Sequence, residues 1–90
     1  MFKTVSEIIE LNKERGRFFF SPETMMFFSS RIEGNRVYGT KYFVTSEQFE
    51  SSDGDLPREY TVRAASDDGD IKTIERFPTK KAAVAFAKKL

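Results

Sequence analysis

The residue types that most often carry catalysis are missing from this sequence. Its 90 residues contain no histidine and no cysteine, which removes the commonest general base, the thiolate nucleophile and the usual transition-metal ligands. Catalysis would have to use a carboxylate pair, a lysine or a tyrosine, and none of these lies in a recognisable motif or beside a glycine-rich phosphate loop. We therefore expect a protein without enzymatic activity, catalytic residues or a cofactor.

One acidic stretch has the composition of a metal site but lacks the spacing. Asp53-Gly54-Asp55 is similar to the start of a calcium loop, but the alternating oxygen ligands that close on a distant Glu do not follow. We therefore expect no bound metal. The whole segment from Glu47 to Pro57 is rich in Ser, Asp, Glu and Gly, which is typical of a mobile surface loop.

The chemistry that the sequence does offer is apolar binding. Met25-Met26-Phe27-Phe28 falls in a segment that we predict as helical from Pro22 to about Arg31, with Ser21 as its N-cap. Four consecutive apolar residues cover most of a helix circumference. The helix is therefore either buried on two sides or presents Met26 and Phe27 to a partner protein or a second copy of the chain.

A second aromatic group follows in residues 36–46, a strand-forming stretch interrupted at Gly39-Thr40. Tyr38, Tyr42 and Val44 share one parity of the alternating pattern, and the other parity is apolar as well. This distribution favours a central strand, or a strand with an aromatic surface on one side. Tyr38 and Tyr42 are therefore further candidate protein-binding residues.

A β-hairpin is predicted in the second half of the chain. Residues 60–65 alternate, Asp68-Gly69 provides a hairpin turn, and Ile71 to Phe77 is rich in β-branched residues. Ile74 breaks the alternation, which indicates either a bulge or a strand end near this residue. The residues expected to face the helices are Tyr60, Val62 and Ala64.

Two more helices are expected near the two ends of the chain. Thr4 and Glu7 fit a capping box, and Gly16 is a stop signal, so the first helix should run from Val5 to about Arg15. Thr79 is the N-cap of the last helix. The apolar stripe of this last helix consists of Ala83, Phe86, Ala87 and Leu90.

These elements predict a single α+β domain, residues 1–90, in the order helix, helix, strand, strand, strand, helix. Short connections would join the strands into a three-stranded antiparallel sheet, with the helices packed on one face. No apolar run reaches the ~20 residues of a membrane span, and the N-terminus lacks the apolar centre of a signal peptide. We therefore expect a cytoplasmic protein that has no membrane contact.

The charge distribution leaves nucleic acid as an alternative ligand. The net charge is only +1, but residues 56–90 carry eight bases and five acids, while the rest of the chain carries seven bases and nine acids. A DNA-binding function would use this local surplus on the sheet face and the last helix. The candidate contacts are Thr61, Arg63, Lys72, Lys80 and Lys81.

Three segments resemble a family of small uncharacterised proteins encoded by bacteriophages and bacteria. They are Phe19 to Met25, Tyr42 to Phe49 and Arg58 to Arg63, and the resemblance extends over nearly the whole chain. It implies a phage-type accessory protein and no particular activity. Small phage proteins of this size often bind and block a host or defence protein, as anti-CRISPR proteins do, so a bacterial protein is the expected partner.

Two shorter resemblances point to nucleic acid. Tyr60 to Leu90 is similar to the arm-DNA-binding domain of phage-type integrases, whose open sheet face enters the major groove. The order helix, three strands, helix is similar to the double-stranded RNA-binding domain, and Thr79-Lys80-Lys81 matches part of its lysine cluster. Val84 stands where that cluster has a third lysine, and the glycine-rich approach is absent. The sequence therefore favours a protein-binding module over a nucleic-acid-binding one.

Overall fold

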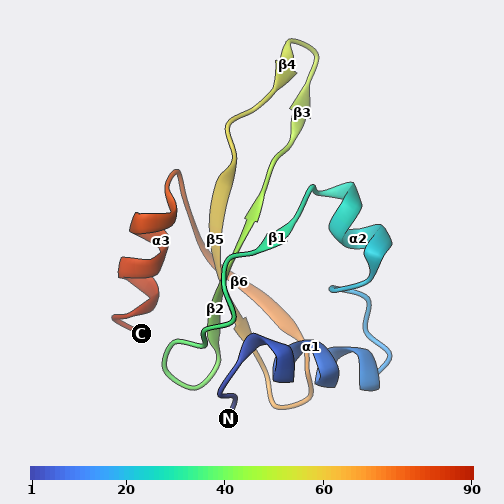
Figure 1. The fold of residues 1–90 in the computed structure, drawn as a ribbon, viewed down its shortest axis with the longest axis vertical. Helices are drawn as coiled ribbons and strands as arrows, with labels where there is room; N and C mark the ends of the chain where they lie inside the picture. The colour runs from blue at the N-terminus through green and yellow to red at the C-terminus, as the bar shows by residue number, and fades with distance from the viewer.

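The computed structural model describes the backbone of residues 1–90 and the side chains of residues 1–49 and 52–90. Along this described backbone, three helices and six strands follow one another (Figure 1). They are α1 Val5–Glu14, α2 Pro22–Phe27, β1 Arg31–Ile32, β2 Tyr42–Glu47, β3 Glu50–Ser51, β4 Gly54–Asp55, β5 Glu59–Ala65, β6 Ile71–Phe77 and α3 Lys80–Ala87. None of the helices described is long and apolar enough to cross a membrane.

Side-chain caps set the start of each helix, as the sequence predicts. The side-chain oxygens of Thr4, Ser21 and Thr79 each accept a hydrogen bond from the backbone N–H three residues later, at 3.4, 3.2 and 3.2 Å. Each cap satisfies a donor that has no partner within the first helical turn. The predicted helices at the two ends of the chain are thereby confirmed as α1 and α3.

The second helix is shorter than predicted, and its early end leaves room for an additional strand. α2 stops at Phe27 rather than near Arg31. Ser29 takes a left-handed φ of 47°, and the N–H of Ser30 donates to the carbonyl of Met25 at 2.7 Å, which ends the helical repeat. Arg31 and Ile32 form β1 instead, so the sheet has four strands in the order β1-β2-β5-β6. The prediction of three strands was wrong, because a two-residue strand is too short to show an alternating pattern.

Strand β2 occupies only the second part of the stretch predicted as extended. Gly39 has a φ of 61° and sits in a tight turn across which Tyr38 and Tyr42 exchange backbone hydrogen bonds of 2.7 and 3.1 Å. β2 then pairs antiparallel with β1 on one side and β5 on the other. Apolar residues of both parities predict a central strand, and the pairing of β2 on both sides confirms this prediction.

The β5–β6 hairpin forms around the predicted Asp-Gly turn. Its register places Val62 opposite Glu75 and Arg63 opposite Thr73, which leaves Ile74 as an extra residue between them. This irregularity is the bulge that the broken alternation predicts. It lets β6 continue along β5 although its apolar residues do not share one parity.

Helices cover both faces of the sheet (Figure 1). The buried cluster on the α1 face consists of Phe2, Val5, Ile8, Phe20, Phe43 and Ala65. The buried cluster on the α3 face consists of Tyr38, Val44, Val62, Ala83 and Ala87. The α+β class and the antiparallel sheet are confirmed, but the expectation of helices on one face was wrong. Neighbouring residues Phe43 and Val44 point to opposite faces, and each face therefore needs its own cover.

The segment predicted as an irregular loop carries two short strands. β3 and β4 pair into a ribbon that projects from the end of the main sheet (Figure 1). The backbone N–H of Leu56 donates to the carbonyl of Phe49 at 2.9 Å and continues the pairing toward the sheet. Glu47, which the sequence assigns to this loop, is instead the last residue of β2.

Candidate functional site

A charged pair is buried in the centre of the sheet on its α1 face. Glu47 ends β2 and Arg63 lies in β5, and their side chains are 5% and 10% exposed. Nη2 of Arg63 lies 3.2 Å from Oε1 of Glu47. Removing two charges from water costs several kcal/mol per ion, so such a pair is stable only where hydrogen bonds satisfy the remaining polar atoms.

Hydroxyl groups supply those hydrogen bonds. Thr61 donates to Oε1 of Glu47 at 2.7 Å, and Thr45 and Ser30 donate to Oε2, each at 2.8 Å. Arg63 donates through Nε to Thr45 and through Nη1 to Thr73, both at 2.8 Å. The donors and acceptors come from β2, β5, β6 and the residue before β1, so one network joins three strands of the sheet to the chain that enters the fourth.

The hydrogen bonds outweigh burial in setting the ionisation of Glu47. Burial raises the pKa of its carboxyl, but the Thr61 and Thr45 hydroxyls, the Arg63 charge and the Ser30 hydroxyl together hold the pKa below its ordinary value. Burial lowers the pKa of Arg63 from its ordinary value, although the Glu47 charge opposes this. Glu47 is therefore a carboxylate at neutral pH.

Sequence reasoning missed this pair, although a signal for it exists. Thr45 and Glu47 share one parity on β2, and Thr61 and Arg63 share one parity on β5. The register pairs Thr45 with Thr61, which brings all four side chains to the same face. Two alternating polar runs that face each other in adjacent strands could have indicated a buried polar network.

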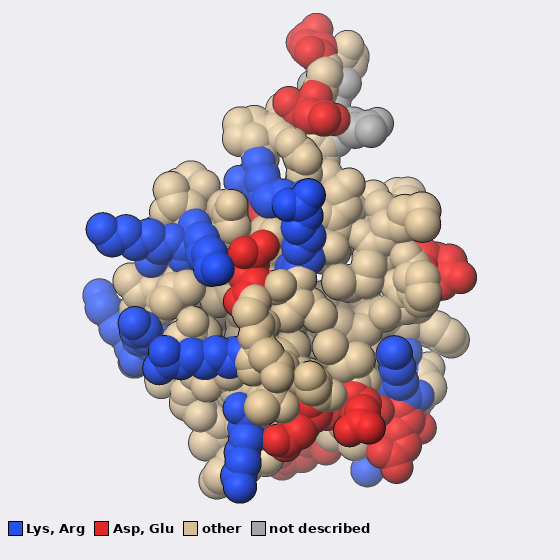
Figure 2. Space-filling model, viewed as in Figure 1, with Lys and Arg blue, Asp and Glu red and all other residues tan. Residues whose placement is uncertain are grey.

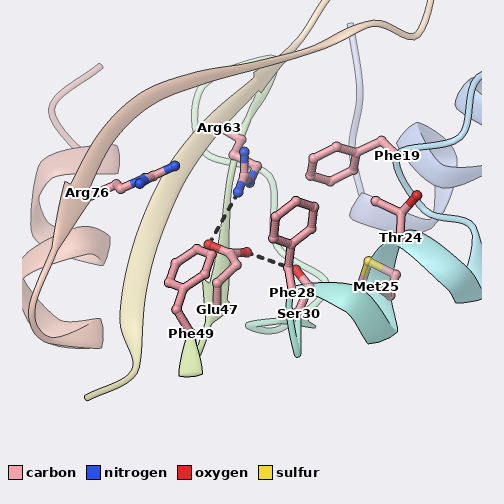
Figure 3. Close-up of a pocket in the computed structure, with 9 residues that line it drawn as sticks. All are labelled: Phe19, Thr24, Met25, Phe28, Ser30, Glu47, Phe49, Arg63 and Arg76. Atoms are coloured by element: carbon pink, nitrogen blue, oxygen red, sulfur yellow. Dashed lines mark hydrogen bonds and ion pairs between the residues drawn. The ribbon is translucent and has the colours of Figure 1, made fainter. Parts of the chain in front are cut away.

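A cavity of about 190 Å³ opens above the charged pair (Figure 3). We call it the Phe28 cavity. It is lined by Phe19, Thr24, Met25, Phe28, Ser30, Glu47, Phe49, Arg63 and Arg76. Aromatic side chains form much of its wall, and the ring centroid of Phe19 lies 4.9 Å from Cζ of Arg63. This contact places an aromatic face directly against the buried cation.

Arg76 brings a second guanidinium to the same cavity. It lies in β6 directly opposite Thr61 of β5, so its side chain leaves the sheet on the face of the charged pair. Figure 3 shows its guanidinium directed toward Glu47 and Arg63. Its positive charge also lowers the pKa of Arg63. Two guanidiniums and one carboxylate give the cavity a positive balance.

An apolar patch adjoins the mouth of the cavity. It consists of Met26, Phe27 and Phe28, which are 78%, 81% and 39% exposed, and we call it the α2 patch. The Phe27 and Phe28 rings make an edge-to-face contact with centroids 4.8 Å apart. The Phe28 and Phe49 rings also pack edge to face, with centroids 6.1 Å apart. Phe28 therefore belongs to both the patch and the cavity wall.

The structure brings together only part of the predicted protein-binding set. Met26 and Phe27 are exposed on α2. Tyr38 is 8% exposed and packs with Tyr42 against the α3 cluster, on the other face of the sheet. The two tyrosines therefore belong to a different surface: Tyr42 has the parity on β2 opposite to that of Glu47, and Tyr38, which precedes the strand, packs in the same α3 cluster.

The predicted nucleic-acid contacts are also divided. Thr61 is fully buried and Arg63 is 9% exposed, and both are engaged with Glu47, so neither is presented to a duplex and the sheet-face docking mode is excluded for them. Lys72, Lys80 and Lys81 are exposed. Nζ of Lys80 lies 3.6 Å from Oε1 of Glu33, so this lysine forms an ion pair within the chain.

These features define a small α+β protein with an aromatic cavity beside an exposed apolar patch. A family model described as a family of unknown function, DUF7447, matches residues 4–89. The match spans nearly the whole chain, so the chain belongs to this family. No curated protein and no solved structure matches the chain.

The lowered pKa of Glu47 predicts a pH-dependent contribution to folding. A carboxyl whose folded pKa lies below its unfolded value of about 4.3 stabilises the fold above that value, and the contribution disappears as the pH falls through the folded pKa. Glu47→Gln should lower the free energy of unfolding by about 3–5 kcal/mol at neutral pH. The difference from the unsubstituted protein should shrink as the solution is acidified.

Urea unfolding at a series of pH values measures this difference. Glu10→Gln is the matched control, because Glu10 is an exposed acid on α1 and its loss should leave the pH profile unchanged. A stability difference for Glu47→Gln that stays constant from neutral to acidic pH would contradict the assignment.

Proposed function

We propose that the protein is a non-enzymatic protein-binding module and that the α2 patch is its contact surface. The observation that carries the proposal is the exposure of Met26 and Phe27, at 78% and 81%, on a helix none of whose residues is buried. Figure 2 supports this reading, because the surface over α2 is largely uncharged while Lys and Arg gather over α3.

The residue types of the patch suit such a contact. Fully burying one Met or Phe side chain contributes about 1.5–3 kcal/mol before the costs of association are subtracted. Aromatic residues and methionine are enriched in the buried centres of protein interfaces. Methionine adapts to irregular surfaces because its side chain is unbranched and flexible.

The proposed partner is a bacterial host or defence protein, which the module would inhibit by occupying a functional surface. The support for this partner is the resemblance to small phage and bacterial proteins, which includes residues 19–25. This segment leads directly into Met26 and Phe27 and contributes Phe19, Thr24 and Met25 to the Phe28 cavity. A CRISPR effector is one such defence protein.

A second candidate function, nucleic-acid binding, is favoured by a basic surface on the other side of the molecule. Lys80, Lys81, Lys88 and Lys89 are all exposed on or beside α3. The turn at Gly39 lies against the C-terminus, since a Cβ on Gly39 would be 3.4 Å from the carbonyl oxygen of Leu90. Arg36 and Lys41, which flank this turn, add two more cations. The α3 surface would therefore replace the closed sheet face as the site of phosphate contacts.

The protein-binding proposal predicts that charge on the patch abolishes partner capture without unfolding the chain. Phe27→Asp should leave the urea unfolding midpoint unchanged, because the side chain is exposed, and should abolish capture of a partner from bacterial lysate. Ile74→Asp is the matched control, because Ile74 is a 41% exposed apolar residue on β6. Equal capture by the unsubstituted protein and both variants would contradict the proposal, and unfolding of Phe27→Asp would place this residue in the core.

Light scattering shows whether the same patch joins two copies of the chain.

The nucleic-acid proposal predicts salt-dependent binding to duplex DNA. Fluorescence anisotropy should detect binding at ~50 mM salt, and the slope of log K against log salt should become shallower by about 0.9 for each phosphate contact removed. Lys81→Gln and Lys88→Gln should each make the slope shallower, whereas Lys13→Gln on α1 should leave it unchanged. No detectable binding at ~50 mM salt would exclude this function, since phosphate contacts are strongest there.

A further inference from the structure

The Phe28 cavity has the size of a subsite for one side chain. Its volume of about 190 Å³ is below the roughly 300–1,000 Å³ typical of pockets that enclose drug-sized ligands or cofactors. It lies between α2 and the sheet, and Phe28 connects it to the α2 patch. A polypeptide that covers the patch would pass its mouth, so a residue of that polypeptide is positioned to enter.

The walls favour an aromatic ring. Phe19, Phe28 and Phe49 present ring faces and edges, and Met25 adds a polarisable sulfur. Two of these rings, Phe28 and Phe49, already pack edge to face, with centroids 6.1 Å apart and an interplanar angle of 77°. An additional ring can continue this arrangement, because aromatic pairs prefer offset or edge-to-face geometry.

At the floor of the cavity, every polar atom of the charged pair already has a partner. Both oxygens of Glu47 accept two contacts each, and all three nitrogens of Arg63 have partners. A polar ligand at this depth would compete with these bonds, and displacing one would weaken the pairing of a buried charge. The floor therefore favours an apolar occupant.

The rim is different, because Arg76 is exposed and its guanidinium has no hydrogen bond or ion pair to any side chain that the structure describes. The neighbouring Glu75 is paired with Val62 and so lies on the other face of the sheet, and its Oε1 accepts the backbone N–H of Arg76 at 3.1 Å. A guanidinium presents five donors in a planar fork that matches a carboxylate. The rim therefore favours a carboxylate beside the apolar occupant.

We propose that the Phe28 cavity receives an aromatic side chain from an acidic segment of the partner protein, and that a carboxylate next to this residue pairs with Arg76. The proposal rests on the protein-binding function and deepens it by naming the chemistry of the partner. Charge complementarity at the rim and continuity with the α2 patch identify the occupant. The partner surface is an acidic peptide with an aromatic anchor.

A nuclear magnetic resonance titration of the ¹⁵N-labelled full chain tests this assignment. The probes are acetyl-Asp-Phe-Asp-amide, its counterpart with two lysines in place of the aspartates, and its counterpart with alanine in place of phenylalanine. The acidic aromatic peptide should shift the backbone amides of Thr24, Phe28 and Arg76. The affinity of the other two peptides should be at least about tenfold lower. A tenfold loss of affinity corresponds to about 1.4 kcal/mol of binding free energy.

Variants then separate the two contacts. Arg76→Gln should bind the acidic and basic aromatic peptides equally, because it removes the charge and keeps the aromatic walls. Lys72→Gln is the matched control, because it removes an exposed cation from the same strand and should retain the preference for the acidic peptide. Equal binding of the acidic and basic peptides by the unsubstituted chain would overturn the proposal.

Three further results would overturn it in favour of another occupant or site. Benzoate that shifts the same amides as strongly as the peptide would identify a small aromatic anion. Shifts of these amides that depend on protein concentration alone would place a second copy of the chain in the cavity. Shifts confined to α3 would place the peptide on the basic surface.

The proposed function can fail or stand independently of this subsite. Loss of partner capture by Phe27→Asp without peptide binding at the cavity would overturn the subsite and leave the contact surface standing. Peptide binding at the cavity together with unaffected capture by Phe27→Asp would uphold the subsite and overturn the contact surface.

Discussion

A charged pair buried in a β-sheet needs a partner for every polar atom, and the rest of this structure is arranged to provide them. The carboxylate of Glu47 and the guanidinium of Arg63 are held by an ion pair and by four hydroxyl groups. These groups come from β2, β5 and β6 and from Ser30, the residue before the short edge strand β1. Because an unpaired buried charge is strongly unfavourable, the network sets both the register of β2 on β5 and the position of the chain that follows α2.

The candidate binding surfaces follow from that network. Arg63 orients the ring of Phe19 above it, and Ser30 holds the chain that carries Phe28 at the edge of the cavity. Each polar atom of the buried pair has a partner, so the proposed recognition would use the aromatic walls, Arg76 and the exposed side chains of α2. The basic α3 surface lies on the opposite face of the sheet and is structurally independent of the cavity. One small domain therefore carries two chemically distinct surfaces, one aromatic and one cationic.

Sequence reasoning succeeded where a structure is encoded locally. The caps at Thr4, Ser21 and Thr79, the Asp-Gly hairpin and the bulge at Ile74 each depend on a few adjacent residues and were predicted correctly. It failed where the decisive partner is distant. Glu47 was assigned to an acidic loop and Arg63 to a DNA-binding face. Charged residues are usually exposed, and only the pairing of β2 with β5 brings these two side chains together. The strand β1 was missed because two residues carry no pattern and because the left-handed turn at Ser29 has no glycine to mark it.

A double-mutant cycle on Glu47→Gln and Arg63→Met, followed by urea unfolding at neutral pH, tests the central claim most directly. If the two side chains form one buried unit, the loss of stability in the double variant is smaller than the sum of the single losses, with a coupling energy of about 1–3 kcal/mol. Additive losses, with a coupling energy near zero, would contradict the account, because each side chain would then act alone.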